Sequence, residues 1–197
     1  MNLAALSKHL EPVPQFQQLL DDLKGPRVSV TAQVVSDGLP FVLATLWKNL
    51  ETPMLIVVPK PEQAIRLHER LQAWTGAEDS IHHFPETETL PFERIVTDIE
   101  TIQQRIRALH ALTTTIGRPP LIVASAVAVA QRTLSRETFE DTEHTISVGD
   151  QIDLDDTLEL WRSMGYRFEN SVYQPGFASR RGGIIDVFPV GASLPAR

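Results

Sequence analysis

The stretch MLIVV at residues 54–58 decides the fold class of this 197-residue chain. It is a continuous apolar run that is rich in β-branched residues, and such runs are typical of parallel strands buried on both faces. PLIVAS at residues 120–125 has the same character, and SIHHF at residues 80–84 predicts a shorter strand. Because helical patterns separate these runs, the alternation predicts an α/β layer built on a parallel sheet.

The helices are predicted from apolar residues that recur three or four positions apart. This spacing predicts helices over residues 14–24, 39–50, 61–74 and 98–112. Pro40 falls in the first turn of the second helix, where proline is tolerated, and Gly76 is expected to end the third. Residues 28–33 alternate around Val28 and Val30 and predict one further strand.

The pattern changes in the last third of the chain. A helix is predicted over about residues 155–164, followed by two glycine-rich strands at 176–181 and 184–189. This order of elements is typical of a small α+β domain. We therefore expect two domains, an α/β scaffold at residues 1–128 and an α+β domain at residues 129–197.

Composition places the chain among globular proteins, since 42% of its residues are hydrophobic and 22% are charged. The absence of cysteine excludes a disulfide scaffold, a cysteine-ligated zinc site, an iron–sulfur cluster and a cysteine nucleophile. No apolar run approaches the ~20 residues of a membrane helix, and the first residues lack the pattern of a secretory signal. We expect a cytoplasmic protein with no membrane contact.

The formal net charge of −7 is unevenly distributed. Residues 157–197 contain five arginines and no lysine, against three acidic residues. Arginine forms planar, bidentate contacts and is enriched at protein interfaces. The asymmetry indicates where a partner could dock, although a solvated surface that happens to use arginine fits it as well.

A phosphate-binding loop would be expected before the first buried helix of the α/β layer. Such loops follow the pattern GxxxxGK[ST], in which backbone N–H groups and the lysine hold the phosphates. The stretch VSVTAQVVSDGLPFVL at residues 28–43 has one glycine, Pro40 stands where the lysine is expected, and the nearest lysine is Lys48. The sequence therefore predicts a P-loop NTPase-like fold that has lost its nucleotide chemistry and holds no cofactor.

One cluster has the residue types of a metal site, namely His82, His83, Glu86 and Glu88. In a strand the two histidines would point to opposite faces, so a polar strand end is the stronger interpretation and no metal site is predicted. No GxSxG motif is present, and no Ser–His–Asp arrangement stands out. We predict no catalytic residue.

The most unusual stretch is GYRFENSVYQPGFASRRGGIIDVFP at residues 165–189. It combines aromatic residues, Phe177 among them, with Arg167, Arg180 and Arg181, and its Gly-Gly pair predicts a tight turn. Arginine beside aromatic residues is typical of the residues that dominate protein interfaces. A structural hairpin with exposed arginines fits the same spacing.

Two stretches carry a resemblance to a known family. FPETETLPFERIVTDIETIQQRIRALHAL at residues 84–112 is similar to the ETLPYD…R…L region of the bacterial transcription-repair coupling factors. RRGGIIDVFPVGASLPAR at residues 180–197 resembles the RGG-[IL]-[IL]-D-[IL]-FP block that this family shares with the excision-repair protein UvrB. The resemblance covers nearly the whole chain and identifies it as similar to the family's UvrB-like N-terminal module.

Two departures from UvrB favour this family over UvrB itself. UvrB keeps a working P-loop and carries a long aromatic hairpin that grips damaged DNA, whereas here only a short link without tyrosine separates Phe84 from the helix at 98–112. The alternative remains a UvrB-like, ATP-dependent protein that binds damaged DNA, which nucleotide binding would reveal. Direct DNA binding through the arginine-rich tail is a third hypothesis, and a steep salt dependence of DNA affinity would reveal it.

The resemblance implies a docking role without catalysis. In this family the second domain recruits the repair protein UvrA, through arginines that match Arg167 and Arg181. Arg180 and Phe177 are weaker matches, because the first lacks a clear counterpart and the second is displaced by one position. In the full-length family other domains bind RNA polymerase and double-stranded DNA, and the motor domains use ATP and Mg. Since a further strand follows the RGG block in the family, we expect the second domain to be incomplete at Arg197.

Overall fold

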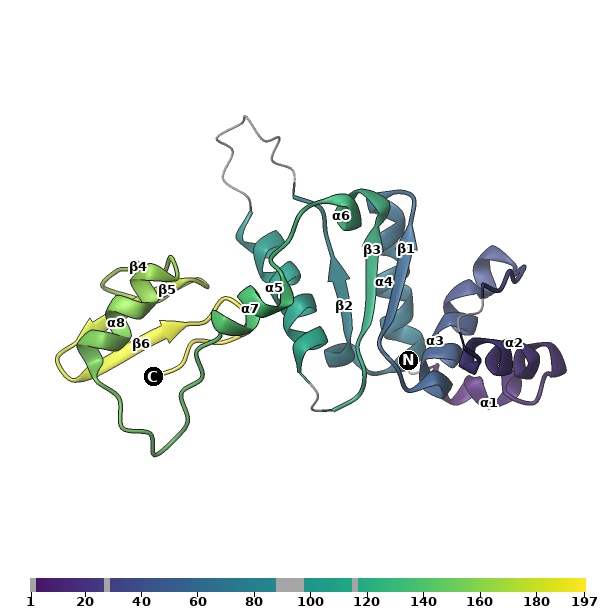
Figure 1. Cartoon of the computed structure of the whole chain (residues 1–197), viewed down its shortest axis with the longest axis horizontal. Coiled ribbons are helices and arrows are strands. Elements are labelled where there is room, and N and C mark those ends of the chain that lie inside the picture. Colours follow the sequence, from purple (N-terminus) through teal and green to yellow (C-terminus); the bar gives the residue numbers. More distant parts are fainter. Residues whose placement is uncertain (1–2, 27–28, 88–97, 115–116) are drawn as a thin grey trace. The chain divides into compact units, whose positions relative to one another are not determined.

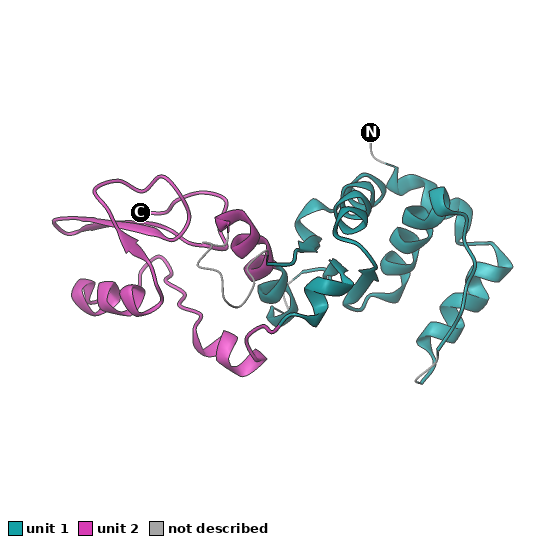
Figure 2. Cartoon of the chain, turned by 90° about the horizontal axis from the view of Figure 1, so that it is seen from above, with its two compact units in different colours: residues 1–88, 108–131 teal, residues 89–107, 132–197 magenta. Residues whose placement is uncertain are grey.

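The computed structural model describes residues 3–26, 29–87, 98–114 and 117–197. The chain forms two compact units, unit 1 at residues 1–88 and 108–131 and unit 2 at residues 89–107 and 132–197 (Figure 2). Each unit has a three-stranded sheet of its own. The predicted fold class, an α/β layer with a parallel sheet followed by a small α+β part, is confirmed. The predicted boundary after residue 128 stays a prediction.

The sheet of unit 1 is parallel throughout, with the strand order β1-β3-β2 (Figure 1). Its strands are β1 (Met54–Val58), β2 (Ile81–Phe84) and β3 (Leu121–Ser125). All five residues of the central strand β3 are buried, as its apolar run from Leu121 to Ala124 predicts, and the buried Ser125 ends the strand.

One face of the edge strand β1 is partly exposed, which corrects the prediction that β1 is buried on both faces. Met54, Ile56 and Val58 pack against the core, whereas Leu55 and Val57 are 54% and 49% exposed. Composition alone did not reveal this, because an all-apolar run reads the same whether one or both of its faces are covered.

The four helices predicted by apolar spacing are found to within one residue at each end. They are α2 (Pro14–Lys24), α3 (Leu39–Leu50), α4 (Pro61–Thr75) and α5 (Ile99–Thr113). Trp47 of α3 and Leu71 of α4 fill the core beside the sheet. Trp47 Nε1 donates a hydrogen bond to the carbonyl of Pro119 at 2.9 Å, so the indole is both packed and satisfied. Gly76 ends α4 with a φ of 62°, as predicted.

The strand predicted over residues 28–33 is wrong for its described part. Residues 29–35 form no strand, and Val28 lies outside the described residues. An alternating pattern makes a strand only where a neighbouring strand accepts its backbone hydrogen bonds, and no described strand pairs with this segment. Three short elements complete this part of unit 1, namely η1 (Ala4–Leu6), α1 (Ser7–Leu10) and η2 (Ser36–Gly38).

The sheet of unit 2 has the order β4-β5-β6, with β4 (Arg167–Phe168), β5 (Phe177–Arg181) and β6 (Ile184–Phe188). β5 and β6 form the predicted antiparallel hairpin, and β4 pairs with β5 in parallel. Gly182 and Gly183 are the two turn residues. Gly182 has a φ of 63° and Gly183 has no positive φ, which matches a type II′ turn.

Helix α8 (Leu154–Ser163) covers one face of this sheet. Asp153 caps the helix, since its side chain accepts hydrogen bonds from the backbone N–H groups of residues 155 and 156. Leu158 and Trp161 are buried with Ala178 of β5. Trp161 Nε1 donates to His144 Nδ1 at 3.0 Å, which ties the irregular segment before α8 to the helix.

The sequence did not predict the shorter elements α6 (Ala126–Ala130), α7 (Arg136–Asp141), η3 (Glu78–Ser80) and β4. Elements of two to six residues are too short to show a period of their own. Within the described residues, no helix has the length and apolar character needed to cross a membrane.

Candidate docking surface

The alternation of side chains in the hairpin sorts the predicted residues onto two faces of the sheet. Ala178 and its cross-strand partner Val187 pack with α8, so Arg180 and its partner Ile185 share that face, which we call the α8 face. The opposite face, which we call the open face because α8 does not cover it, carries the remaining residues of the two strands. These are Phe177, Ser179, Arg181, Ile184, Asp186 and Phe188, of which Phe177 and Ser179 are buried.

β4 adds Arg167 to the open face. Arg167 is in register with Phe177, whereas its neighbour Phe168 is in register with Ala178 and packs in the α8 cluster. Arg167 and Arg181 therefore share one face, separated by four residues of register, or about 13 Å along the strand. The structure brings these two predicted residues together and places Arg180 on the opposite face.

Asp186 holds two guanidinium groups on the open face. Arg197 donates to Asp186 from Nε at 2.7 Å and from Nη2 at 3.3 Å, and Arg181 donates from Nη2 at 2.5 Å. The hydrogen bonds from Arg197 and then from Arg181 lower the pKa of Asp186 from 3.8 to about 2. Asp186 is thus charged at neutral pH and fixes the position of Arg181.

Sequence reasoning did not assign Asp186 or Arg197 to the surface. The signal for Asp186 lay in the hairpin register: with a two-residue turn after Arg181, it falls on the same face as that arginine, on the neighbouring strand. Arg197 could not be found in this way. It reaches Asp186 because Ala196 pairs with Val187 along the outer edge of β6.

Phe177 is 5% exposed, so its ring is not presented to solvent. Its ring centre lies 4.9 Å from that of Tyr173, which is 66% exposed. Tyr173 is therefore the accessible aromatic group at this position, and Phe177 packs beneath it. The direct contact role of Phe177 stays a prediction.

On the α8 face, Arg180 forms an ion pair with Asp155 of α8. Its Nε also donates to the carbonyl of Gly182 at 3.2 Å. These contacts connect the hairpin turn to the first turn of the helix.

The start of α3 is the place where a nucleotide-binding fold would hold its phosphate loop. Pro40 is buried in the first turn of α3, and the short helix η2 precedes it. Lys48 Nζ donates to Ser7 Oγ at 2.8 Å and to Glu11 Oε1 at 2.9 Å. The hydrogen bond from Lys48 is the largest cause of the lowered pKa of Glu11. The nearest lysine is thus engaged with the N-terminal helices of unit 1.

The described members of the histidine and glutamate group at residues 82–88 make separate contacts. Glu86 Oε2 accepts a hydrogen bond from Ser125 Oγ at 3.0 Å, and the ring of His83 lies 5.8 Å from that of His68. Glu88 lies outside the described residues. No group of three histidine, aspartate or glutamate side chains in the described ranges could hold a metal ion.

Known proteins share sequence similarity with this chain, including the part that carries the two faces. Residues 145–197 match the family model of the UvrB interaction domain, a range that contains α8 and the whole β4-β5-β6 sheet. The chain is 26% identical over 199 residues to the transcription-repair-coupling factor of Mycobacterium tuberculosis (strain CDC 1551 / Oshkosh), covering 99% of this chain and 16% of that protein. The same-named proteins of Escherichia coli (strain K12) and Bacillus subtilis (strain 168) are 27% and 26% identical, over 74% and 92% of this chain and 12% and 15% of those proteins.

The chain thus spans about one-sixth or less of the length of these curated relatives. The similarity to the first of them extends over nearly the whole chain, and the family model falls on the sheet that carries the predicted arginines. The resemblance indicated by the RRGGIIDVFP block is therefore confirmed: the chain is similar to the transcription-repair coupling factors, and its residues 145–197 match the UvrB interaction domain.

Proposed function

We propose that this chain is a non-catalytic docking module that recruits the excision-repair protein UvrA to stalled transcription complexes. The observation that carries the proposal is the position of Arg167 and Arg181 on one open sheet face. That face lies within the residues that match the UvrB interaction domain. The names of the relatives support a role that couples transcription to repair.

The open face has the chemistry of a surface that binds carboxylates. A guanidinium group donates two parallel hydrogen bonds to a carboxylate, which fixes the register of a partner as well as attracting it. Because Asp186 already restricts the side chain of Arg181, less conformational entropy is lost when a partner binds. The exposed ring of Tyr173 supplies an apolar contact beside the charged groups.

Unit 1 serves as a scaffold without nucleotide in this proposal. Pro40 occupies the turn where a phosphate loop would need its lysine, and Lys48 is paired with Glu11. We assign the binding of RNA polymerase, of double-stranded DNA and of ATP with Mg to other parts of the longer relatives. This unit then has no catalytic step of its own.

The direct test is a binding titration of the chain with purified UvrA. Arg181→Ala and Arg167→Ala are each expected to weaken binding by roughly 1–4 kcal/mol if they are interface hot spots. Arg136→Ala is the matched control, because Arg136 is an exposed arginine of unit 2 that pairs with Glu140 on its own helix. Circular dichroism would verify that each variant is folded.

Equal binding by the parent chain and both variants would reject this site. A separate calorimetric titration with Mg–ATP tests the scaffold role of unit 1, for which no heat of binding is expected. Micromolar ATP binding would favour the UvrB-like alternative instead.

A further inference from the structure

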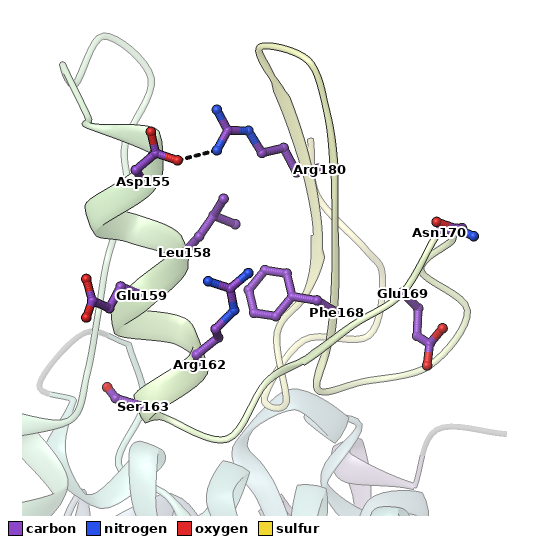
Figure 3. A pocket seen from close by; sticks show the side chains of 9 residues that line it. All are labelled: Asp155, Leu158, Glu159, Arg162, Ser163, Phe168, Glu169, Asn170 and Arg180. Carbon is purple, nitrogen blue, oxygen red and sulfur yellow. Dashed lines mark hydrogen bonds and ion pairs between the residues drawn. The ribbon is translucent and has the colours of Figure 1, made fainter.

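The α8 face of unit 2 contains an open groove of about 860 Å³ between α8 and the sheet (Figure 3). Phe168 of β4 provides its accessible apolar part, and Leu158 of α8 forms a buried part of its wall. Leu158 is buried and Phe168 packs against the same cluster, so these groups are fixed by the core of the unit. The groove shares none of its lining residues with the open face.

Two guanidinium groups enter this groove from opposite walls, Arg162 from α8 and Arg180 from β5 (Figure 3). Arg162 Cζ lies 4.7 Å from the ring centre of Phe168, and no carboxylate among the described residues forms an ion pair with it. Arg180 is paired with Asp155 at the mouth of the groove. The groove therefore holds one guanidinium that pairs with no carboxylate of the described residues, and a second whose carboxylate partner, Asp155, is 81% exposed.

Two further carboxylates lie at the rim rather than inside. The side chains of Glu159 and Glu169 point away from the two guanidinium groups (Figure 3). The groove is therefore lined by three carboxylates and two guanidinium groups, and its positive charge is confined to Arg162 and Arg180, beside the apolar ring of Phe168. A continuous phosphodiester backbone would meet these rim carboxylates, whereas a peptide can place single carboxylates between apolar side chains.

We propose that this groove is a second docking site, which binds an extended acidic segment of a partner protein. One carboxylate of the segment accepts hydrogen bonds from Arg162 and takes the place of Asp155 beside Arg180. A neighbouring apolar side chain of the segment covers the ring of Phe168. The groove is separate from the proposed UvrA surface, so an experiment can reject one of the two proposals and leave the other in place.

The test uses fluorescence anisotropy of the whole chain with a fluorescein-labelled peptide in which glutamates alternate with leucines. The same peptide with glutamine in place of glutamate controls for apolar binding. Arg162→Gln and Arg180→Gln are each expected to weaken binding at least fivefold. Asp155→Asn is expected to strengthen binding two- to fivefold, because it releases Arg180 from its ion pair.

Arg136→Gln is the matched control, since it removes an exposed arginine of unit 2 that belongs to neither surface and should leave the peptide affinity unchanged. An equal loss in Arg136→Gln would show attraction to charge in general and overturn the proposal. No binding of the acidic peptide at millimolar concentration, or weaker peptide binding by Asp155→Asn, would also overturn the proposal.

A thymidine oligonucleotide tests the groove for nucleic acid. If it binds more tightly than the acidic peptide, and if the Arg162 and Arg180 variants lose that binding, the proposal is overturned. Arg162 does not contact the hairpin turn, so its variant remains informative if Arg180→Gln unfolds.

Discussion

The two faces of the β4-β5-β6 sheet hold the same type of residue in opposite settings. On the open face, Arg181 is held by Asp186 of its own sheet, and its side chain is 62% exposed. On the α8 face, Arg180 is tied to Asp155 of another element, and its side chain is 39% exposed. Two arginines that are adjacent in the sequence thus differ in what they can reach. The difference shows that the role of an arginine in a hairpin depends on its face and on what covers that face.

The largest expected effect is a loss of stability when the packing between α8 and the sheet is weakened. Trp161→Ala deletes a buried indole and its hydrogen bond to His144, and we expect a loss of about 3–5 kcal/mol in the unfolding free energy of unit 2. Chemical denaturation followed by circular dichroism measures this loss. Leu160→Ala is the control on the same helix, because Leu160 is exposed and its removal should cost under about 1 kcal/mol. Similar losses in the two variants would contradict the packing described for α8.

The next largest effect is a difference in UvrA affinity between variants of Arg180 and Arg181. Arg181→Ala should weaken binding to UvrA by roughly 1–4 kcal/mol, as expected for an interface hot spot. Arg180→Ala should change the affinity by less than about 0.5 kcal/mol, because its side chain lies on the other face. Both are measured by surface plasmon resonance at one salt concentration. The reverse order would mean that UvrA binds the α8 face.

The turn that joins the two strands can be tested with its own glycine pair. Gly182 has a φ of 63° and open space around its missing Cβ, so Gly182→Ala should cost about 1–2 kcal/mol of stability through backbone strain alone. Gly183→Ala, where φ is not positive and the space is also open, should cost less. Thermal unfolding of the two variants compares them directly. Equal costs would argue against the type II′ turn.

The smallest effect concerns the ion pairs of the open face. The pKa of Asp186 is lowered from 3.8 to about 2, so the folded state holds this proton less tightly than the unfolded state. The stabilisation is therefore present above about pH 4 and is lost as the pH falls towards 2. The urea midpoints of the parent chain and of Asp186→Asn should converge over this range. A constant difference between them down to pH 2 would exclude titration of Asp186 as the source.

Much of the fold could be predicted because its longer elements have a clear period. α3 and α8 have apolar residues at helical spacing over three turns or nearly so, and β3 is apolar from Leu121 to Ala124. The exposed face of β1 could not be predicted, since it depends on which elements cover the sheet and not on the composition of one strand. The strand predicted over residues 28–33 was wrong for a related reason, because an alternating pattern does not show whether a neighbouring strand is present to pair with it.

The candidate site was predicted in part. That Arg180 and Arg181 point to opposite faces follows from strand geometry, and the hairpin itself was predicted. Which face stays open depends on where α8 packs, and that contact joins residues distant in the sequence. The burial of Phe177 beneath Tyr173 depends in the same way on the path of the loop before β5.

The alternation of side chains in β5 affects which sequence changes this hairpin can accept during evolution. A substitution can alter the open face or the groove by itself, because no residue belongs to both. Insertion or deletion of one residue within β5 would instead exchange Arg180 and Arg181 between the two faces and alter both surfaces together. We therefore expect homologues to tolerate changes of residue in this hairpin more readily than changes of its length.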